Sequence, residues 1–309
     1  ELKSRGLGDV YKRQEYMDHV SDTIYAAFKV KVSNLDIIKD ADVIIWTTTP
    51  WTIPANKALA YNAGLKYILL EINDNKNFID RKIVIAKDLL EIFKKDTSIE
   101  NIKVLNEFLG KDLKGTICSH PFSKMEYNYD IPMLEANFVT TEQGTGIVHC
   151  APSHGPDDFN LCLNNNIKAI ETVDGDGKYT SEIKLFEGLH IFKANNLIIE
   201  KLDEQKNLVT NGKLTHSYPH SWRSKAPLVH RATPQWFISM ESHGLRDKAL
   251  KAIDNTDFYP SKGKERIKSM IETRPDWCVS RQRVWGVPLP IFISKKTGDV
   301  LVDDEVFEN

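Results

Sequence analysis

The first two thirds of the chain alternate short apolar runs with polar turns, a pattern that indicates many short strands. The apolar run within 41–47 has the length of a buried strand and ends in threonines. Between Ile24 and Val32 the side chains alternate in part between apolar and polar. Strands are therefore predicted at residues 15–32, 41–47, 66–72 and 81–86, with a strand end at 147–149.

Helical spacing of apolar residues is confined to a few segments. Residues 193–204 carry one apolar stripe, which predicts an amphipathic helix. Pro156 is followed by Asp157 and Asp158, and this order is typical of a first helical turn, where proline is tolerated and acids face the positive end of the helix dipole. Further helical patterns occupy 89–93 and 265–272.

The mixture of short strands with few helices predicts an α/β protein in which 35–205 forms one compact, barrel-like α+β domain. Residues 15–34 are predicted to be strands of a stalk that leads into this domain. After residue 206 the character of the sequence changes, and 231–240 holds one strand-like apolar core. Residues 1–14 show neither strand alternation nor a helical stripe, and we expect them to be non-native or disordered.

The composition is that of an ordinary soluble globular protein, with 41% hydrophobic and 27% charged residues. No apolar run approaches about 18 residues and the start has no apolar signal region, so we expect no membrane span and a cytoplasmic protein. The four cysteines are far apart, which favours reduced thiols over disulfides. The net charge of −2 gives no support for a broad phosphate-binding surface.

Two stretches, 46–56 and 144–158, place small hydroxyl residues, glycines and prolines beside strong polar groups. Chains usually build rigid polar pockets in this way. Thr47, Thr48 and Thr49 supply three stiff hydroxyls at the end of a predicted strand, although threonine also favours strands for its own sake. The two stretches are interpreted as two walls of one site.

His149 and Asp158 each have a plainer explanation, since a lone histidine is more often a satisfied structural residue and an acid at a helix start is more often a cap. Together with the threonines they suit a site that binds a cationic amine and positions water beside an ester. The sequence contains no serine nucleophile elbow, dinucleotide fingerprint or phosphate loop. No Glu or Cys completes a zinc spacing around His149 and His154, so no metal is expected.

Four long motifs, in order along the chain, resemble isoleucyl-tRNA synthetase, a class I family. They are residues 46–56, 144–158, 231–237 and 276–286, and the likeness extends over about 15–309. Pro50 and Trp51 favour the isoleucyl branch, because the valyl and leucyl relatives usually carry a Thr-Thr-Arg-Pro stretch where this chain has Thr-Thr-Thr-Pro-Trp.

The resemblance implies part of a larger enzyme. The family's ATP-handling signatures, His-Ile-Gly-His and Lys-Met-Ser-Lys-Ser, do not occur in this sequence. What remains resembles an editing domain at 35–205, inserted in a split, Rossmann-like class I catalytic fold, with the stalk and the start of the second half of that fold at 206–309. Ligation is not expected from this chain. Editing would need no cofactor, and ATP and magnesium would belong only to the full-length ligase.

The resemblance also implies an activity, the hydrolysis of valine wrongly attached to the isoleucine tRNA, with valyl-adenylate as a possible further substrate. The α-ammonium group of valine would be held by Asp158, and His149 would form the wall that collides with isoleucine. A water oriented by threonine hydroxyls and by the terminal ribose hydroxyl of the tRNA would attack the ester. The residues carried over are Thr48, His149 and Asp158 as catalytic groups, and Thr47, Thr49 and Asn56 as substrate-binding groups.

One departure concerns metal binding. Where some family members carry a zinc-binding Cys-Trp-Arg-Cys, this chain has Ser221 and Ser224 at the cysteine positions, and serine is a poor zinc ligand. The expected partner is the 3′ end of tRNA(Ile) carrying valine, bound by a monomer. Three alternatives stay open: a valyl- or leucyl-type editing domain, a non-catalytic or inactive tRNA-binding fragment, and a generic small-ester hydrolase.

Overall fold

The structure is a computed structural model that describes residues 14–281, 286–287, 289, 291–301 and 303. The chain divides into two compact units, the first ending at Thr233 and the second beginning at Pro234. The segment 1–14, expected to be non-native or disordered, lies outside the described residues except for Gln14, which begins the first strand.

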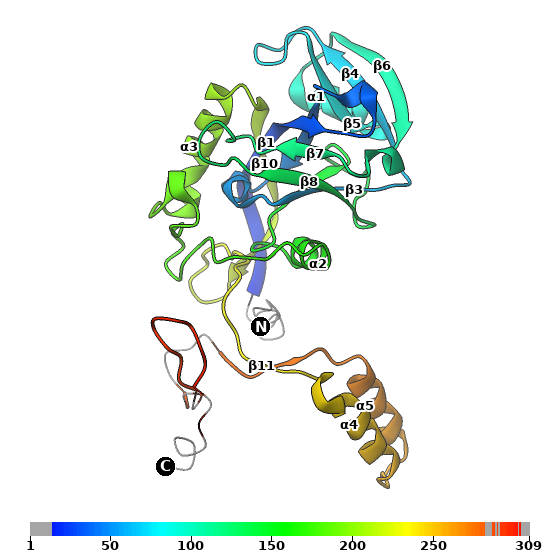
Figure 1. Cartoon of the computed structure of the whole chain (residues 1–309), viewed down its shortest axis with the longest axis vertical. Helices are drawn as coiled ribbons and strands as arrows, with labels where there is room; N and C mark the ends of the chain where they lie inside the picture. Colours follow the sequence, from blue (N-terminus) through cyan, green and yellow to red (C-terminus); the bar gives the residue numbers. More distant parts are fainter. Residues whose placement is uncertain (1–13, 282–285, 288, 290, 302, 304–309) are drawn as a thin grey trace. The chain divides into compact units, whose positions relative to one another are not determined.

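Within the described part of the first unit, ten strands form one mixed sheet in the order β6-β4-β5-β2-β1-β7-β8-β3-β9, and β10 pairs with β1 beside this path (Figure 1). Two pairs, β2 with β5 and β3 with β8, are parallel. The prediction of an α/β protein rich in short strands is confirmed. The strands are β1 (Gln14–Val32), β2 (Asp42–Thr47), β3 (Ala58–Tyr61), β4 (Lys66–Ile72), β5 (Arg81–Ala86), β6 (Ile102–Leu109), β7 (Ile117–Ser119), β8 (Asp130–Glu135), β9 (Ile147–Cys150) and β10 (Leu208–Ser221).

The long strand β1 is the spine of the sheet because it pairs with three strands along its length. It pairs with β10 from Gln14 to Ala26, and then with β2 and β7. From Ile24 to Phe28 its side chains alternate between the main core, which holds Ile24 and Ala26, and a second core, which holds Tyr25 and Ala27. Both faces of this part of β1 are therefore covered, which explains its largely apolar sequence.

The sheet approaches a barrel without closing into one, since no ladder joins β6 to β9 among the described strands. A backbone hydrogen bond from Ala86 N to Thr145 O (2.7 Å) ties the end of β5 to the approach to β9. Gly146 lies at the same crossing with a φ of +71°, and a Cβ on it would lie 2.3 Å from Ala86 Cβ. Only glycine fits there, so the predicted barrel-like character comes from a close crossing rather than from strand pairing.

Helices cover the sheet at a few places. The helix predicted at 193–204 is confirmed as α3 (Ile191–Glu204), which buries Ala194, Ile198 and Leu202 against the main core. The predicted helix start at Pro156 is confirmed as the first residue of α2. The other helical segments of this unit are η2 (Asp36–Ile38), η3 (Pro50–Ala55), η4 (Lys87–Leu89), α1 (Leu90–Thr97), η5 (Gly110–Leu113), α2 (Pro156–Asn164) and η6 (Lys184–Phe186).

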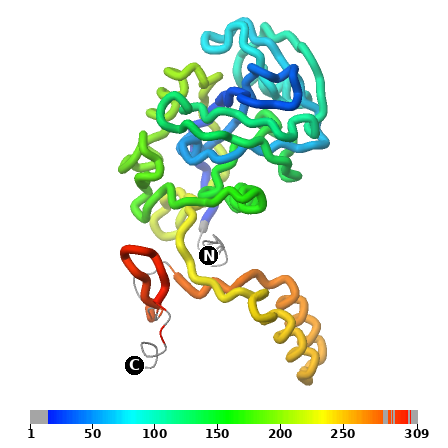
Figure 2. Tube along the Cα trace, viewed as in Figure 1, coloured from blue at the N-terminus to red at the C-terminus, as the bar shows by residue number. Residues whose placement is uncertain are grey.

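The second unit is built on two helices, α4 and α5, which lie side by side (Figure 2). Arg246, near the start of α4, donates hydrogen bonds to the carbonyl oxygens of Ile271, Glu272 and Arg274 at the end of α5. The strand-like segment predicted at 231–240 is limited to the two residues of β11, which pair with β12. The elements are β11 (Phe237–Ile238), η7 (Ser242–Gly244), α4 (Leu245–Asp254), α5 (Lys262–Glu272) and β12 (Trp277–Cys278).

Candidate hydrolytic site

Residues 47–56 form a buried turn at the end of β2, and the sequence explains its shape. β2 ends at Thr47, and the chain then enters η3, whose first residue is Pro50. Pro54 has no backbone N–H and so cannot extend a regular helical ladder. Every residue of η3 is buried. The threonines are thus carried by a rigid turn at the edge of the main core.

Three aromatic side chains from distant parts of the chain hold the backbone carbonyls of this turn. The hydrogen bonds run from Tyr179 Oη to Trp51 O (2.5 Å), from His120 Nε2 to Ile53 O (3.0 Å) and from Tyr129 Oη to Asn56 O (2.9 Å). These three donors are called the η3 clamp. Burial raises the pKa of the two tyrosines and lowers the pKa of His120 to about 3, so all three stay neutral donors near neutral pH.

The hydroxyl groups of Thr47, Thr49 and Thr52 form a connected cluster. Thr47 Oγ1 accepts a hydrogen bond from Thr49 N (3.1 Å) and lies 3.1 Å from Thr49 Oγ1. Thr49 Oγ1 lies 3.3 Å from Thr52 Oγ1, and Thr52 Oγ1 donates to Thr49 O (2.8 Å). Thr52 was not among the residues singled out from the sequence, although it lies inside the 46–56 motif. The structure adds it to the site because one 3-10 turn places it against Thr49.

His149 extends this cluster from β9, where it is paired with Leu59 of β3. His149 Nε2 lies 2.7 Å from Thr52 Oγ1, and His149 Nδ1 lies 2.8 Å from the side-chain nitrogen of Asn56. Both His149 and Asn56 are buried. Burial lowers the pKa of His149 to about 3, so its imidazole is neutral near neutral pH.

Asp158 occupies the first turn of α2, where the helix dipole favours a negative charge. Its Oδ2 accepts a hydrogen bond from Ala151 N (2.9 Å), which ties it to the chain just after β9. Burial nevertheless raises the pKa of Asp158 to about 6, and the neighbouring carboxylate of Asp157 acts in the same direction. As a residue Asp158 is only partly buried, and a desolvated carboxylate is stabilised by a cationic partner.

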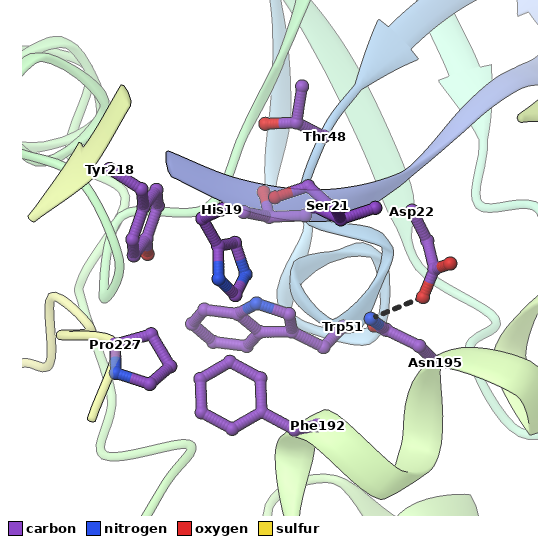
Figure 3. A pocket seen from close by; sticks show the side chains of 11 residues that line it. His19, Ser21, Asp22, Thr48, Trp51, Phe192, Asn195, Tyr218 and Pro227 are labelled. Atoms are coloured by element: carbon purple, nitrogen blue, oxygen red, sulfur yellow. Dashed lines mark hydrogen bonds between the residues drawn. The ribbon is translucent and has the colours of Figure 1, made fainter. Parts of the chain in front are cut away.

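A cavity of about 210 Å³ adjoins the threonine turn. Thr48, Thr49 and Trp51 form its wall on the side of η3, and the rest is formed by residues of β1, α3 and β10 and by Pro227 in the segment after β10. Figure 3 shows the rings of His19, Trp51 and Phe192 following one another along it. Aromatic walls with a few hydroxyl groups suit a ligand that is partly apolar and partly polar.

The structure brings most of the predicted site residues together, in two overlapping sets. Four of them form one hydrogen-bonded group that Thr52 connects. Thr48 and Thr49 line the cavity. His149 and Asp158 are not among the residues that line it. The hydrogen-bonded group consists of Thr47, Thr49, Asn56 and His149.

Comparison with known proteins identifies the family. A profile described as tRNA synthetases class I (I, L, M and V) matches residues 6–309. The chain belongs to the class I tRNA synthetase family. It is 72% identical over 96% of its length to the isoleucine–tRNA ligase of Pelagibacter ubique, and 44% identical over 95% of its length to that of Gluconobacter oxydans. The predicted resemblance to isoleucyl-tRNA synthetase is confirmed.

The chain spans about a third of the length of these synthetase relatives, 33% of the first and 32% of the second. Among solved structures it is similar to the editing domain of the P. falciparum cytosolic leucyl-tRNA synthetase. The TM-score is 0.45 and the identity 13%, over 60% of this chain and 98% of that one. In the part of the chain that the structure describes, no group of three His, Cys, Asp or Glu side chains is placed to hold a metal ion. No described helix has the length and apolar character that crossing a membrane requires.

Proposed function

We propose that this chain hydrolyses valine from the tRNA that should carry isoleucine, as the editing part of an isoleucine–tRNA ligase. The observation that supports this function is the connected threonine cluster between the end of β2 and η3, which reaches a cavity through Thr49 and is bonded through Thr52 to a neutral His149. The relatives are isoleucine–tRNA ligases that extend well beyond this chain. The partner is then the 3′ end of the isoleucine tRNA, and the chain acts as a monomer in the cytoplasm.

Asp158 is the proposed anchor for the α-ammonium group of the bound valine. A carboxylate that is partly withdrawn from water binds an ammonium group more strongly than an exposed one, because the local dielectric constant is lower. The raised pKa of Asp158 means that the ion pair is available above about pH 6 and is lost when the carboxyl is protonated below that pH.

Hydrolysis needs a water molecule beside the ester carbonyl. Thr48 and Thr49 both line the cavity, and a threonine hydroxyl can donate to one oxygen while it accepts from another. We infer that they orient this water together with the terminal ribose hydroxyl of the tRNA, with no covalent intermediate, cofactor or metal. Such a reaction is accelerated by holding the water close to the ester carbonyl and by hydrogen bonds that stabilise the transition state.

The need for a second site follows from the small difference between the two amino acids. One methylene in an apolar pocket changes binding by about 1–3 kcal/mol, a general value for which isoleucyl-tRNA synthetase choosing between isoleucine and valine is the standard example. A separate hydrolytic site that admits only the smaller side chain adds a second selection. The sequence resemblance gave the exclusion of isoleucine to His149; because His149 is buried and does not line the cavity, that role is left out of the proposed mechanism.

The experiment that tests this function is deacylation of valyl-tRNA and isoleucyl-tRNA, both on the isoleucine acceptor, by the purified chain. We expect loss of valine while isoleucine is spared. If neither is hydrolysed by a folded protein that still binds the tRNA, the chain is a non-catalytic tRNA-binding fragment. Equal hydrolysis of both, and of simple esters, would identify a small-ester hydrolase instead.

A further inference from the structure

The hydrogen bonds behind Thr49 have a fixed direction, and that direction can be determined atom by atom. The side-chain nitrogen of Asn56 lies 2.9 Å from Ala58 O, and a backbone carbonyl can only accept. This contact identifies the group as the NH₂ of the amide. The same nitrogen lies 2.8 Å from His149 Nδ1. Since His149 is neutral and its Nδ1 faces a donor, Nδ1 carries no proton.

The proton of the neutral imidazole is therefore on His149 Nε2, which donates to Thr52 Oγ1 (2.7 Å). Thr52 Oγ1 in turn donates its own proton to Thr49 O (2.8 Å). Having used its proton, Thr52 can act toward Thr49 Oγ1, 3.3 Å away, only as an acceptor. The direction of each hydrogen bond from Asn56 to Thr49 thus follows from the orientation of the Asn56 amide, the neutral His149 and the Thr49 carbonyl, which can only accept.

The amide of Asn56 is only half satisfied, since its NH₂ group donates to both Ala58 O and His149 Nδ1 while its oxygen has no partner among the described residues. Its Oδ1 is buried and accepts no hydrogen bond from any described residue, and an unsatisfied buried acceptor is costly. Such costs are typically kept where a site requires a particular arrangement. Here the arrangement is the donation from Asn56 to His149.

We propose that Asn56, His149 and Thr52 form a directional relay that draws the Thr49 proton inward and leaves a lone pair of Thr49 Oγ1 facing the cavity. Thr49 Oγ1 then accepts a hydrogen bond from the attacking water, which orients a lone pair of that water toward the ester. Thr52 is a new positioning residue, and His149 acts through it rather than on the substrate. The effect of the relay on catalysis rests on the proposed hydrolytic function, whereas the direction of its hydrogen bonds does not.

The direction of the relay can be measured without any reaction. In the full chain labelled with ¹⁵N-histidine, the shifts of His149, assigned by comparison with His149→Gln, report which ring nitrogen carries the proton. We expect protonation at Nε2 in the natural sequence. We expect protonation at Nδ1 in Asn56→Asp, because a carboxylate can only accept. Protonation at Nδ1 in the natural sequence would overturn the relay, whether or not the chain hydrolyses anything.

The consequence for the reaction is tested with Thr52. Thr52→Val keeps the shape but breaks the relay, and we expect kcat for valyl-tRNA to fall about 10- to 100-fold with little change in KM. Thr52→Ser restores the hydroxyl and should restore kcat to within about threefold. The matched control is Thr116→Val, which removes a buried hydroxyl bonded to Ser33 Oγ (2.9 Å) and should leave kcat unchanged.

Three outcomes distinguish this relay from the proposed function itself. An Nε2 proton with the expected loss and recovery of kcat supports both. Equal kcat for Thr52→Val and the natural sequence overturns the relay and leaves the function standing. If the natural sequence hydrolyses nothing, the function fails, and the position of the His149 proton still decides for or against the relay.

Discussion

Asp158 combines two properties that usually oppose each other. It lies at a helix start, which favours its charged form, yet burial raises its pKa to about 6 from a usual value of 3.8. The folded protein therefore binds the proton of Asp158 more tightly than the unfolded chain does. The stability from this group is present below about pH 4 and is lost as the pH rises through about 6, so at neutral pH the carboxylate destabilises the fold. A residue that is retained at such a cost is a good candidate for function.

The substitution Asp158→Asn separates these two roles. The amide oxygen can still accept from Ala151 N, while the charge that would bind an ammonium group is removed. We expect valyl-tRNA deacylation to fall about 10- to 100-fold, the strength of a hydrogen bond to a charged partner. Thermal unfolding near pH 8 should show a variant at least as stable as the natural protein, and this advantage should vanish near pH 5.

The matched control for Asp158→Asn is Asp157→Asn, on the same helical turn but exposed. It should keep full deacylation. If Asp158→Asn also keeps full activity while Asp157→Asn does not, the anchor has been assigned to the wrong carboxylate. A pH profile adds a second check, since activity of the natural protein should decline as the pH falls below about 6.

At the scale of elements, the η3 clamp explains how a short 3-10 segment interrupted by Pro54 holds its shape. Each of the three carbonyls that the clamp binds has a neutral donor from another part of the fold, so the turn depends on tertiary structure more than on its own sequence. Trp51, which lines the cavity, is held in this way by Tyr179. Removing the Tyr179 hydroxyl should therefore disturb the cavity wall formed by Trp51 and also lower the stability of the fold.

Tyr179→Phe tests this coupling. Removing the hydroxyl leaves the buried Trp51 carbonyl without its donor, and we expect the free energy of unfolding in urea to drop by about 1–2 kcal/mol. We also expect slower deacylation, because the wall that carries Trp51 is less well fixed. Tyr25→Phe is the control, since its hydroxyl binds Asp96 (2.8 Å). It should lower stability to a similar degree and leave deacylation unchanged.

The helices and strands that could be predicted from the sequence are those whose buried side chains give a regular spacing or a continuous run of apolar residues. β4 and β5 were predicted at 66–72 and 81–86, the bounds they have in the structure, because their apolar runs are buried and bounded by turns. β10 has largely exposed side chains, and its pairing with β1 rather than its own alternation makes it a strand. α4 was missed because it buries little, and Arg246 holds it against the end of α5.

The site was predictable in its residue types and less so in its connections. The motif 46–56 indicated the threonines, and His149 and Asp158 came from the second motif. Their assigned roles stay predictions. The sequence could not reveal that His149 is connected to the cavity through Thr52 and Thr49, because the contact of His149 with Thr52 joins β9 to η3, which are far apart in the chain. Nor could it reveal the η3 clamp, whose donors have no local signature.

At the scale of the whole molecule, the extent of the first unit is set by strand pairing. The sequence placed the end of the editing domain at 205, whereas the compact unit in the structure runs to Thr233. The added residues include β10, which pairs with β1 and places Leu208 and Val209 in the two cores. Asn77 and Asn75 also donate to the carbonyls of Leu208 and Val209. These contacts attach β10 to the compact unit, and the end of the editing domain at 205 stays a prediction.

Two shortened chains test this directly, one ending at residue 233 and one at residue 205. The first keeps β10, and with it Tyr218 and Pro227 in the cavity wall. We expect it to unfold cooperatively, at the same temperature as the main transition of the full chain, and to keep the full chain's activity on valyl-tRNA. The second loses β10, one of the three strands that pair with β1, and exposes apolar side chains of both cores, so it should aggregate or lack a cooperative transition.

The comparison is decisive because both chains lack the second unit. If the chain ending at 205 folds as well as the longer one, the pairing of β1 with β10 contributes little, and the boundary predicted from the sequence is right. If the chain ending at 233 also fails to fold, the first unit depends on residues beyond Thr233. Circular dichroism melting separates these outcomes, and deacylation by the folded chain then shows whether one unit suffices for the reaction.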